Sequence, residues 1–320
     1  MKLSRWDKLA SRLATRLRGN IGLEAAVRRG LPPPKHRLIL YEYEASPWCR
    51  LVREYATILN LSLHIRPCPR QTLFLEGAFD ASSRFRPEAM NYLQTHRHTD
   101  DLTFPLLVDA TAAAAVAAKE DKPIVVTQSY DILEHLWKNY GQNVLPNQHR
   151  PDQKWNSSQI PFPLRFLSLA GPSYLRPWPT SGVLQTPSLW DEKSTHKLTL
   201  YQAEGCPESR LTREILCTLE LPYQSIPVGQ NSSNSLPVDG DDTSNALHTP
   251  VLIDGDYTLQ GAHACIEHLW NNYRDPNGKL PVWWNPKPSP NLGRAGSFGV
   301  GAYTAFLTGS RAFVPSQAMQ

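Results

Sequence analysis

Apolar residues recur in the same order in two separate stretches of the chain, residues 37–63 and residues 197–223. Each stretch opens with a short apolar run, RLILYEY or KLTLYQA, of the kind that forms a buried strand. A proline follows, and the apolar positions after it share one helical face, which predicts a helix. These positions are Leu51, Val52, Tyr55, Ala56 and Leu59 in the first stretch and Leu211, Ile215, Leu216 and Leu219 in the second.

The two stretches also share identical residues at a constant offset, including the Leu-Tyr pair of the strand and an RLxRE sequence in the helix. Further along, FPLLVD corresponds to TPVLID, and SYDILEHLWKNYG corresponds to AHACIEHLWNNYR. The repeat predicts a duplicated α/β unit of strand, helix, strand, variable region, proline-initiated strand, short strand and helix.

A length of 320 residues also favours two compact domains. The predicted division is a basic N-terminal segment with a proline spacer at 1–36, a first domain at 37–145, a linker at 146–196, a second domain at 197–277 and an irregular tail at 278–320. The linker is expected to hold one short helix near Phe166. The pair Trp283 and Trp284 predicts that part of the tail is docked.

The composition excludes some classes of function. The net charge is only +4 and the Lys and Arg residues are spread along the chain, so no nucleic-acid partner is predicted. No apolar run is long enough to span a membrane. Five cysteines without zinc-ligand spacing predict a reducing compartment, the cytoplasm, and no metal.

The first twenty residues, MKLSRWDKLASRLATRLRGN, form a basic amphipathic pattern. Trp6, Leu9, Leu13 and Leu17 fall on one helical face, and arginines supply charge around it. Three interpretations stay open: a helix docked on the body of the protein, a targeting peptide for a plastid or other organelle, and a helix lying on a membrane surface.

The repeated order of elements, SPWC or CPES at the first helix, and a proline opening the third strand resemble the thioredoxin-like N-terminal domain of glutathione transferases and glutaredoxins. The stretches YEYEASPWCRLVRE and REILCTLELPY resemble proteins that carry two such domains in tandem. The resemblance implies an α/β fold with two tandem thioredoxin-like domains of the glutathione transferase N-terminal type. It also implies that the all-helical transferase C-terminal domain is absent.

Cys206 is the candidate nucleophile. A thiol at a helix N-terminus faces unpaired backbone N–H groups and the positive end of the helix dipole, which favour the nucleophilic thiolate. The resemblance to monothiol glutaredoxins implies that Cys206 is the attacking thiol and that Ser209 replaces the resolving cysteine. The alternative is a cysteine retained from the duplication without a role.

In the first copy the corresponding position is Ser46, and Cys49 lies one turn deeper, where similar folds bury the resolving residue. Similarity to serine-type glutathione transferases implies that the Ser46 hydroxyl donates a hydrogen bond to the glutathione thiolate. Serine before proline is also a favoured helix N-cap, which needs no catalytic role.

The resemblance further implies glutathione, as co-substrate, bound beside two cis-proline turns, Phe104-Pro105 and Thr249-Pro250. Gln128-Ser129 resembles the pair that holds the γ-glutamyl carboxylate at a helix N-terminus, which is a sound anion site. The second copy has Gly261 and Ala262 at those positions.

The sequence therefore predicts a glutathione-linked thiol oxidoreductase or transferase-like protein, acting on a disulfide or an electrophile. The alternative is a non-catalytic binding or scaffold protein with a protein partner.

Three further features are expected to have no catalytic role. The EHLW histidines are expected to be packing or hydrogen-bonding groups, the RLxRE charges a solvated face or a domain-interface ion pair, and Cys68 an exposed thiol. These residues are His135, His268, Arg50, Arg53, Glu54, Arg210, Arg213, Glu214 and Cys68.

Overall fold

The computed structural model describes two units of the chain, an N-terminal helix and a few intervening residues. The described residues are 5–17, 22–25, 37–69, 83–110, 123–141, 145, 150–151, 171, 189–190, 197–232, 234–237 and 249–274. The helix expected near Phe166 and the docking expected for Trp283 and Trp284 lie outside them, as do nearly all of the linker and the whole tail from residue 278.

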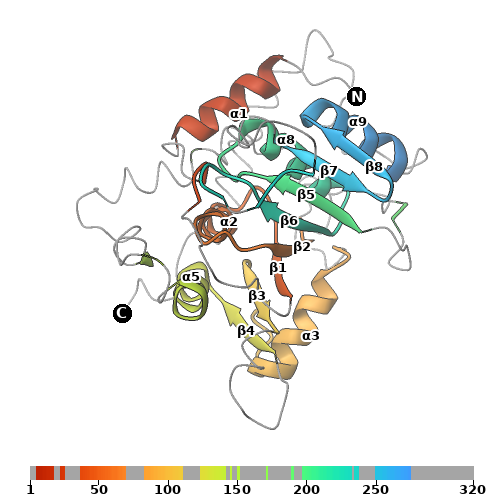
Figure 1. The fold of residues 1–320 in the computed structure, drawn as a ribbon. Helices are drawn as coiled ribbons and strands as arrows, with labels where there is room; N and C mark the ends of the chain where they lie inside the picture. Colours follow the sequence, from red (N-terminus) through yellow and green to blue (C-terminus); the bar gives the residue numbers. More distant parts are fainter. Residues whose placement is uncertain are drawn as a thin grey trace.

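Unit 1, residues 37–141, contains the predicted strands and helices in the predicted order, and a further helix lies in the variable region between its second and third strands, where the repeat had predicted no element (Figure 1). They are β1 (Leu38–Glu42), α2 (Pro47–Ile58), β2 (Leu63–Pro67), α3 (Arg86–Arg97), β3 (Leu106–Asp109), β4 (Ile124–Thr127) and α5 (Ser129–Leu136). The last helix differs in one detail from the sequence pattern, because it continues from Trp137 to Gly141 as a π-helical turn, η1.

Unit 2, residues 197–274, repeats this order. Its elements are β5 (Leu198–Gln202), α8 (Pro207–Thr218), β6 (Tyr223–Pro227), β7 (Val251–Asp254), β8 (Tyr257–Gln260) and α9 (Ala262–Tyr273). Residues 238–248, in the variable region, lie outside the described part.

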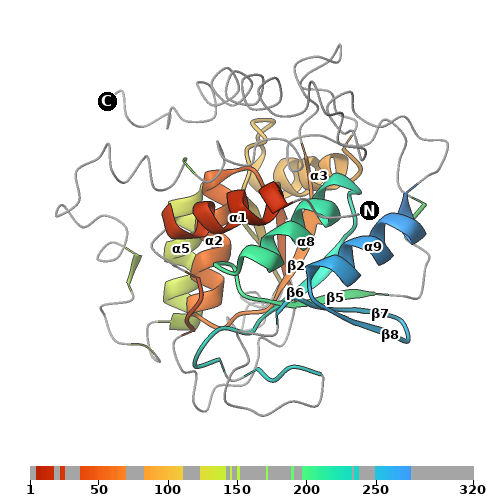
Figure 2. The same ribbon diagram turned by 90° about the horizontal axis from the view of Figure 1, so that it is seen from above.

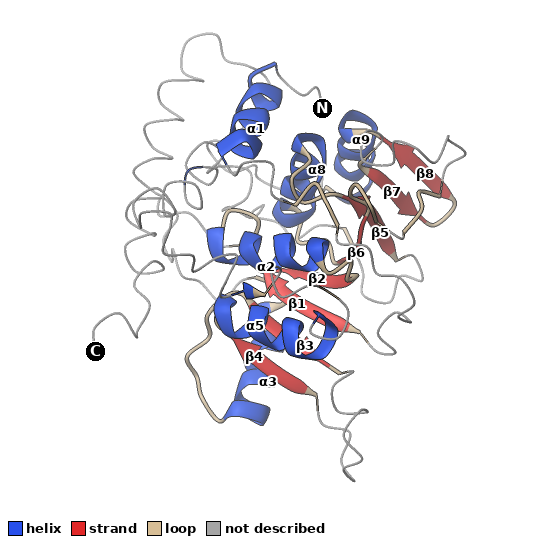
Figure 3. Ribbon diagram, turned by 60° about the vertical axis from the view of Figure 1, so that its left-hand side comes forward, coloured by secondary structure: helices blue, strands red, loops and turns tan. Residues whose placement is uncertain are grey.

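The two units share one eight-stranded sheet, in the order β4-β3-β1-β2-β6-β5-β7-β8 (Figure 3). Within each unit the first two strands are parallel and the other pairs antiparallel. The units meet where β2 pairs with β6 antiparallel, with His64 opposite Gln224. Strands β2 and β6 would each be an edge strand if its unit stood alone. Their pairing satisfies both edges, which could otherwise pair with strands of another chain.

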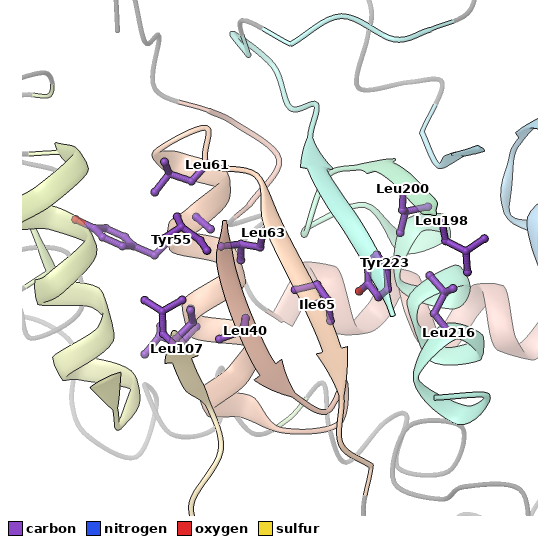
Figure 4. Close-up of a cluster of buried hydrophobic side chains, with 14 of the residues drawn as sticks. Leu40, Tyr55, Leu61, Leu63, Ile65, Leu107, Leu198, Leu200, Leu216 and Tyr223 are labelled. Atoms are coloured by element: carbon purple, nitrogen blue, oxygen red, sulfur yellow. The ribbon is translucent and has the colours of Figure 1, made fainter. Parts of the chain in front are cut away.

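The main apolar core lies between this sheet and helices α2, α5, α8 and α9. It is continuous across the join, since Ile65 of β2 and Tyr223 of β6 are both buried in it (Figure 4). A smaller cluster covers the other face of unit 1, where Ala89 and Leu93 of α3 pack against Tyr41, Leu106 and Val108. Helix α3 therefore completes a layer of helix on each side of the sheet in unit 1.

The EHLW histidines tie the last helix of each unit to the sheet, as expected. His135 Nε2 lies 2.7 Å from Asp109 Oδ2, and the Tyr140 hydroxyl donates to the same oxygen at 2.8 Å. The second copy repeats this with His268, Asp254 and Tyr273, at 2.8 Å for both bonds. Because the networks are the same in both units, they are structural features of the repeat.

The N-terminal segment forms helix α1 (Arg5–Leu17), which lies alongside α8 (Figure 2). The Ser11 hydroxyl donates to the Pro207 carbonyl at 2.7 Å, and the Thr15 hydroxyl donates to the Gly205 carbonyl at 2.9 Å. The docked-helix interpretation is therefore confirmed. Among the described residues, no helix is both long and apolar enough to cross a membrane.

Candidate functional site

The two positions exchanged between the copies, Ser46 and Cys206, have the same backbone conformation. Ser46 has φ −71° and ψ 121°, and Cys206 has φ −72° and ψ 124°. Each is the N-cap of a helix that opens with proline, and each backbone N–H donates to a carbonyl three residues earlier at 3.0 Å. The two N-cap positions therefore differ in their side chains and not in their backbones.

The Cys206 thiol does not cap its helix. Its Sγ lies 3.7 Å from the carbonyl oxygen of Thr249, the residue before Pro250, and the Thr249-Pro250 peptide bond is cis, as predicted. The N–H of Gly261, which precedes α9, donates to the Pro250 carbonyl at 2.8 Å. The thiol, the cis-proline turn and the start of α9 thus form one site in unit 2.

Space is open beside this site. A side chain at Gly261 would meet no heavy atom within 4 Å of its Cβ position. Thr249 and Ala262 are buried, and Cys206 is 8 % exposed. The thiol is therefore largely covered, although it stands at a helix N-terminus.

Ser46 is used as a helix cap, which confirms the N-cap interpretation. Its hydroxyl oxygen accepts a hydrogen bond from the backbone N–H of Cys49 at 3.2 Å, and the residue is 1 % exposed. The Phe104-Pro105 bond is cis, as predicted, and the Phe104 ring packs edge-on against Tyr43 at 6.5 Å. Cys49 is fully buried, and burial raises the pKa of its thiol to about 12.

Gln128 and Ser129 lie at the start of α5, as expected. Thr127 pairs with Leu106 across the sheet, so Gln128 follows the strand end that adjoins Pro105. Gln128 is exposed and has the unusual backbone angles φ 68° and ψ 130°. Helices α5 and α9 lie at opposite ends of the sheet, so this pair does not join Cys206 (Figure 1).

The N-terminal segment flanks the Cys206 turn on both sides. Thr15 and Ser11 bond the carbonyls of Gly205 and Pro207, and the N–H of Gly205 donates to the Gly22 carbonyl at 3.1 Å. The sequence carries no local sign of these contacts with the Cys206 turn, because about 190 positions separate the partners. Helix α1 therefore restricts access to the thiol from its side.

The remaining cysteines are deeply buried. Cys49, Cys217 and Cys265 lie in helices and are 0 %, 3 % and 0 % exposed. Cys68 was expected to be an exposed thiol, and this prediction was wrong, because the residue is 1 % exposed beneath α3. Burial raises the pKa of the Cys68 thiol above its usual range, and does the same for Cys217 and Cys265.

We expect iodoacetamide to label Cys206 before the other four cysteines in the native protein near neutral pH. Cys206 is 8 % exposed, whereas Cys217 is 3 % and Cys49 is 0 % exposed, and reaction requires an accessible thiolate. Mass spectrometry of peptides sampled over time gives the rate for each site. Equal rates for Cys206 and Cys68 would contradict this order.

A buried charge cluster joins the units behind the two N-cap turns. Arg53 of α2 holds Glu204 through Nε and Nη2, at 2.9 and 3.1 Å, and Arg213 of α8 holds Glu44 in the same way at 3.0 and 3.1 Å. Each arginine thus binds a glutamate of the other unit, and that glutamate lies two residues before the N-cap residue, Cys206 or Ser46. Two parallel hydrogen bonds between a planar guanidinium and a carboxylate pair the charges and also fix the relative orientation of the two side chains.

The cluster decides between two interpretations of the RLxRE residues. A solvated face is excluded, because Arg53 and Arg213 are 2 % and 1 % exposed, and the domain-interface ion pair is confirmed. The glutamates that receive these arginines, Glu44 and Glu204, were not singled out from the sequence. Their recurrence at the same place in both copies, YEYEAS and YQAEGC, was the available signal.

The two units contribute different numbers of carboxylates to the cluster. Arg53 also contacts Glu42, whereas the corresponding contact of Arg213 is the neutral amide of Gln202. Burial, together with Glu44 and Glu204, outweighs the attraction of Arg53 and raises the pKa of Glu42 to about 7. Arg213 and Arg53 overcome the effect of burial at Glu44 and lower its pKa to about 2.

We expect the substitution Glu42→Gln to stabilise the protein above pH 7 and to have little effect below pH 4.5. The folded pKa of Glu42, about 7, exceeds its ordinary value of 4.5, so the stability that depends on its proton is complete below about 4.5 and is lost as the pH rises through about 7. The gain at high pH is on the order of 3 kcal/mol, because one pKa unit corresponds to about 1.4 kcal/mol. Urea unfolding across this pH range measures it.

The reciprocal substitution Gln202→Glu is the control for this experiment. It adds a carboxylate at the corresponding position and should destabilise the protein at neutral pH. A stability difference between Glu42→Gln and the original protein that does not change with pH would mean that Glu42 does not titrate in this range.

The fold and the site define a thioredoxin-like α/β protein with a thiol at a helix N-terminus beside a cis-proline turn. The family model for the glutathione S-transferase N-terminal domain matches residues 40–144 and 200–277, which is more than half of the chain. The chain belongs to this family. Neither a curated protein nor a solved structure matches it.

Proposed function

We propose that this protein is a glutathione-dependent thiol oxidoreductase that uses Cys206 as its nucleophile. The Cys206 thiolate attacks the glutathione sulfur of a mixed disulfide, and the substrate leaves as a thiolate. A glutathione thiolate then attacks the Cys206 mixed disulfide, which releases glutathione disulfide and restores Cys206. Both steps are thiol–disulfide exchanges and need one protein thiol only.

One observation carries this proposal: with nearly identical backbones, Ser46 caps its helix while the Cys206 thiol points to the cis-proline turn. Because the Cys206 thiol makes no capping hydrogen bond to its own helix, its sulfur can act as a nucleophile. Ser209, one turn deeper in α8, is completely buried and supplies no second thiol. These features favour a monothiol exchange over a dithiol mechanism.

The residues around Cys206 fit glutathione through backbone groups. Residues that precede such a cis proline offer backbone hydrogen bonds to the cysteinyl part of glutathione in related proteins, and Thr249 occupies this position beside the thiol. The start of α9 presents unpaired N–H groups for a carboxylate, and the space above Gly261 is open.

Two measurements on the full chain test the proposal. Retention on glutathione-agarose tests binding, and reduction of hydroxyethyl disulfide by glutathione, coupled to glutathione reductase, tests turnover. We expect both to be positive. Retention without turnover would favour the alternative, a non-catalytic binding protein, and the absence of both would remove the glutathione-linked function altogether.

Unit 1 is proposed as a separate glutathione-binding site, because Gln128 keeps a costly backbone conformation. Gly261 takes a similar conformation in unit 2, φ 83° and ψ 151°, where glycine pays no steric penalty. A residue with a side chain in this region costs on the order of 1 to 3 kcal/mol. The presence of a side chain at this position despite that cost points to a role for Gln128, namely to bind the γ-glutamyl group.

We expect Gln128→Gly to raise stability while it lowers glutathione affinity. Relief of the backbone strain, less the entropy cost of glycine, gives a gain of about 1 kcal/mol. Loss of a hydrogen bond to a charged carboxylate costs about 1.5 to 3 kcal/mol of binding free energy. Chemical denaturation measures the first effect, and titration calorimetry measures the second.

The reverse substitution, Gly261→Gln, is the matched control. No heavy atom of the described residues lies within 4 Å of the Cβ position, so a loss of stability is expected to come mainly from the positive φ of this residue. Unchanged glutathione affinity in Gln128→Gly would remove Gln128 from the binding site. A loss of stability in that variant would show that the side chain serves the fold.

A further inference from the structure

Helix α1 docks through its small polar face. Ser11 and Ala14 are fully buried and Thr15 is 4 % exposed, and the hydrogen bonds of this face run to the turn around Cys206. Arg210 of α8 adds a bond from its guanidinium to the Ser11 carbonyl at 2.9 Å. The contact with the body is therefore made by hydroxyls and backbone groups rather than by the leucines.

The leucines of α1 lie on its other side. Leu9, Leu13 and Leu17 are 45 %, 42 % and 43 % exposed. An amphipathic helix that docks on a protein ordinarily buries its apolar stripe, and α1 does the reverse. Of the described residues, Gly171 lies against Leu17, and Leu17 nevertheless keeps this exposure.

A row of cations accompanies the leucines. Lys8, Arg12 and Arg16 are all exposed, and each directly precedes one of the three leucines. Asp7 is the only acidic residue among the first twenty-three. The exposed side of α1 thus combines a leucine row with a row of positive charge.

We propose that this surface, Leu9, Leu13 and Leu17 with Lys8, Arg12 and Arg16, binds the surface of an anionic lipid membrane. Leucines that enter the boundary between headgroups and acyl chains bury apolar area, and adjacent cations meet the negative headgroups. A second copy of the chain is a poorer partner, because pairing two such surfaces brings their cations together. The docked face meanwhile holds unit 2, with its Cys206 turn, next to the membrane.

Co-sedimentation of the full chain with vesicles tests the proposal. We expect binding to vesicles of phosphatidylcholine with phosphatidylglycerol, weaker binding to phosphatidylcholine alone, and a loss of binding as salt is added. Each cation near an anionic surface contributes about 1 kcal/mol, so Lys8→Gln, Arg12→Gln and Arg16→Gln together should lower the partition coefficient about a hundredfold.

The leucine row has its own variant and control. Leu9→Ser, Leu13→Ser and Leu17→Ser together should abolish binding, whereas Leu189→Ser should not change it, although Leu189 is 59 % exposed. All three variants should keep the original melting temperature, because the changed residues are exposed.

Three outcomes would overturn the membrane proposal. The first is equal or absent binding of the original protein to both kinds of vesicle. The second is a concentration-dependent dimer, seen by light scattering, that the leucine variant no longer forms, since this would assign the surface to a second copy. The third is a large loss of melting temperature in the leucine variant, which would show that the chain itself covers the leucines.

Discussion

Substitution of Cys206 by serine is expected to abolish the turnover of hydroxyethyl disulfide. The serine hydroxyl has nearly the same size but cannot form the mixed disulfide, so the rate should fall by at least about a thousandfold, an order typical of a lost nucleophile. The coupled assay with glutathione reductase measures this rate. The fold should survive, because Cys206 makes no capping bond that serine would lose.

Cys265→Ser is the matched control for Cys206→Ser. It makes the same chemical change in the same unit, at a buried thiol that contacts the Leu259 carbonyl, and it should keep the turnover rate. Incubation with glutathione disulfide supplies a second readout, since one glutathione should be added at Cys206 and none in the Cys206→Ser variant. Turnover by that variant at the original rate would refute the proposed role of Cys206.

Substitution of Arg213 by methionine is expected to cost about 3 to 5 kcal/mol of unfolding free energy, the usual result when one partner of a buried ion pair is removed. Methionine fills part of the space but leaves Glu44 without its two-point partner in the interior. The loss should appear as a lower urea midpoint, and the two units should separate more readily because this contact crosses between them.

Two variants control for the Arg213 effect. Lys138→Met removes an exposed pair with Glu134, whose side chains are 63 % and 55 % accessible, and should change stability by less than about 0.5 kcal/mol. Arg213→Met combined with Glu44→Gln should recover part of the loss, because the double variant also removes the buried carboxylate that Arg213 held at two points. If Arg213→Met costs no more than Lys138→Met, the cluster contributes nothing to stability.

The repeat made the order of elements in each unit predictable. Strand and helix patterns, the proline that opens α2 and α8, and the serine cap at Ser46 all depend on neighbours within a few residues. The two cis prolines were predicted from the resemblance to a known family, because a cis bond is a minority state that local sequence does not reveal.

Other features depended on residues far apart in the chain. The exposure expected for Cys68 was wrong because α3 and the strands of unit 1 cover it. The leucine stripe of α1 did not reveal which face of the helix would dock, because hydrogen bonds to carbonyls about 190 residues away set its orientation. Neither contact leaves a periodic signal in the sequence.

The sequence by itself determined the two α/β units, their local caps and the exchange of serine for cysteine at one helix N-terminus. Only the tertiary structure decided that the units share a sheet through β2 and β6, that their arginines and glutamates are buried between them, and that the Cys206 thiol turns toward Thr249. The physical reason is the distance along the chain over which the interactions act. Local patterns arise from the backbone and the next turn, whereas burial and charge pairing depend on surfaces that meet only after the chain has folded.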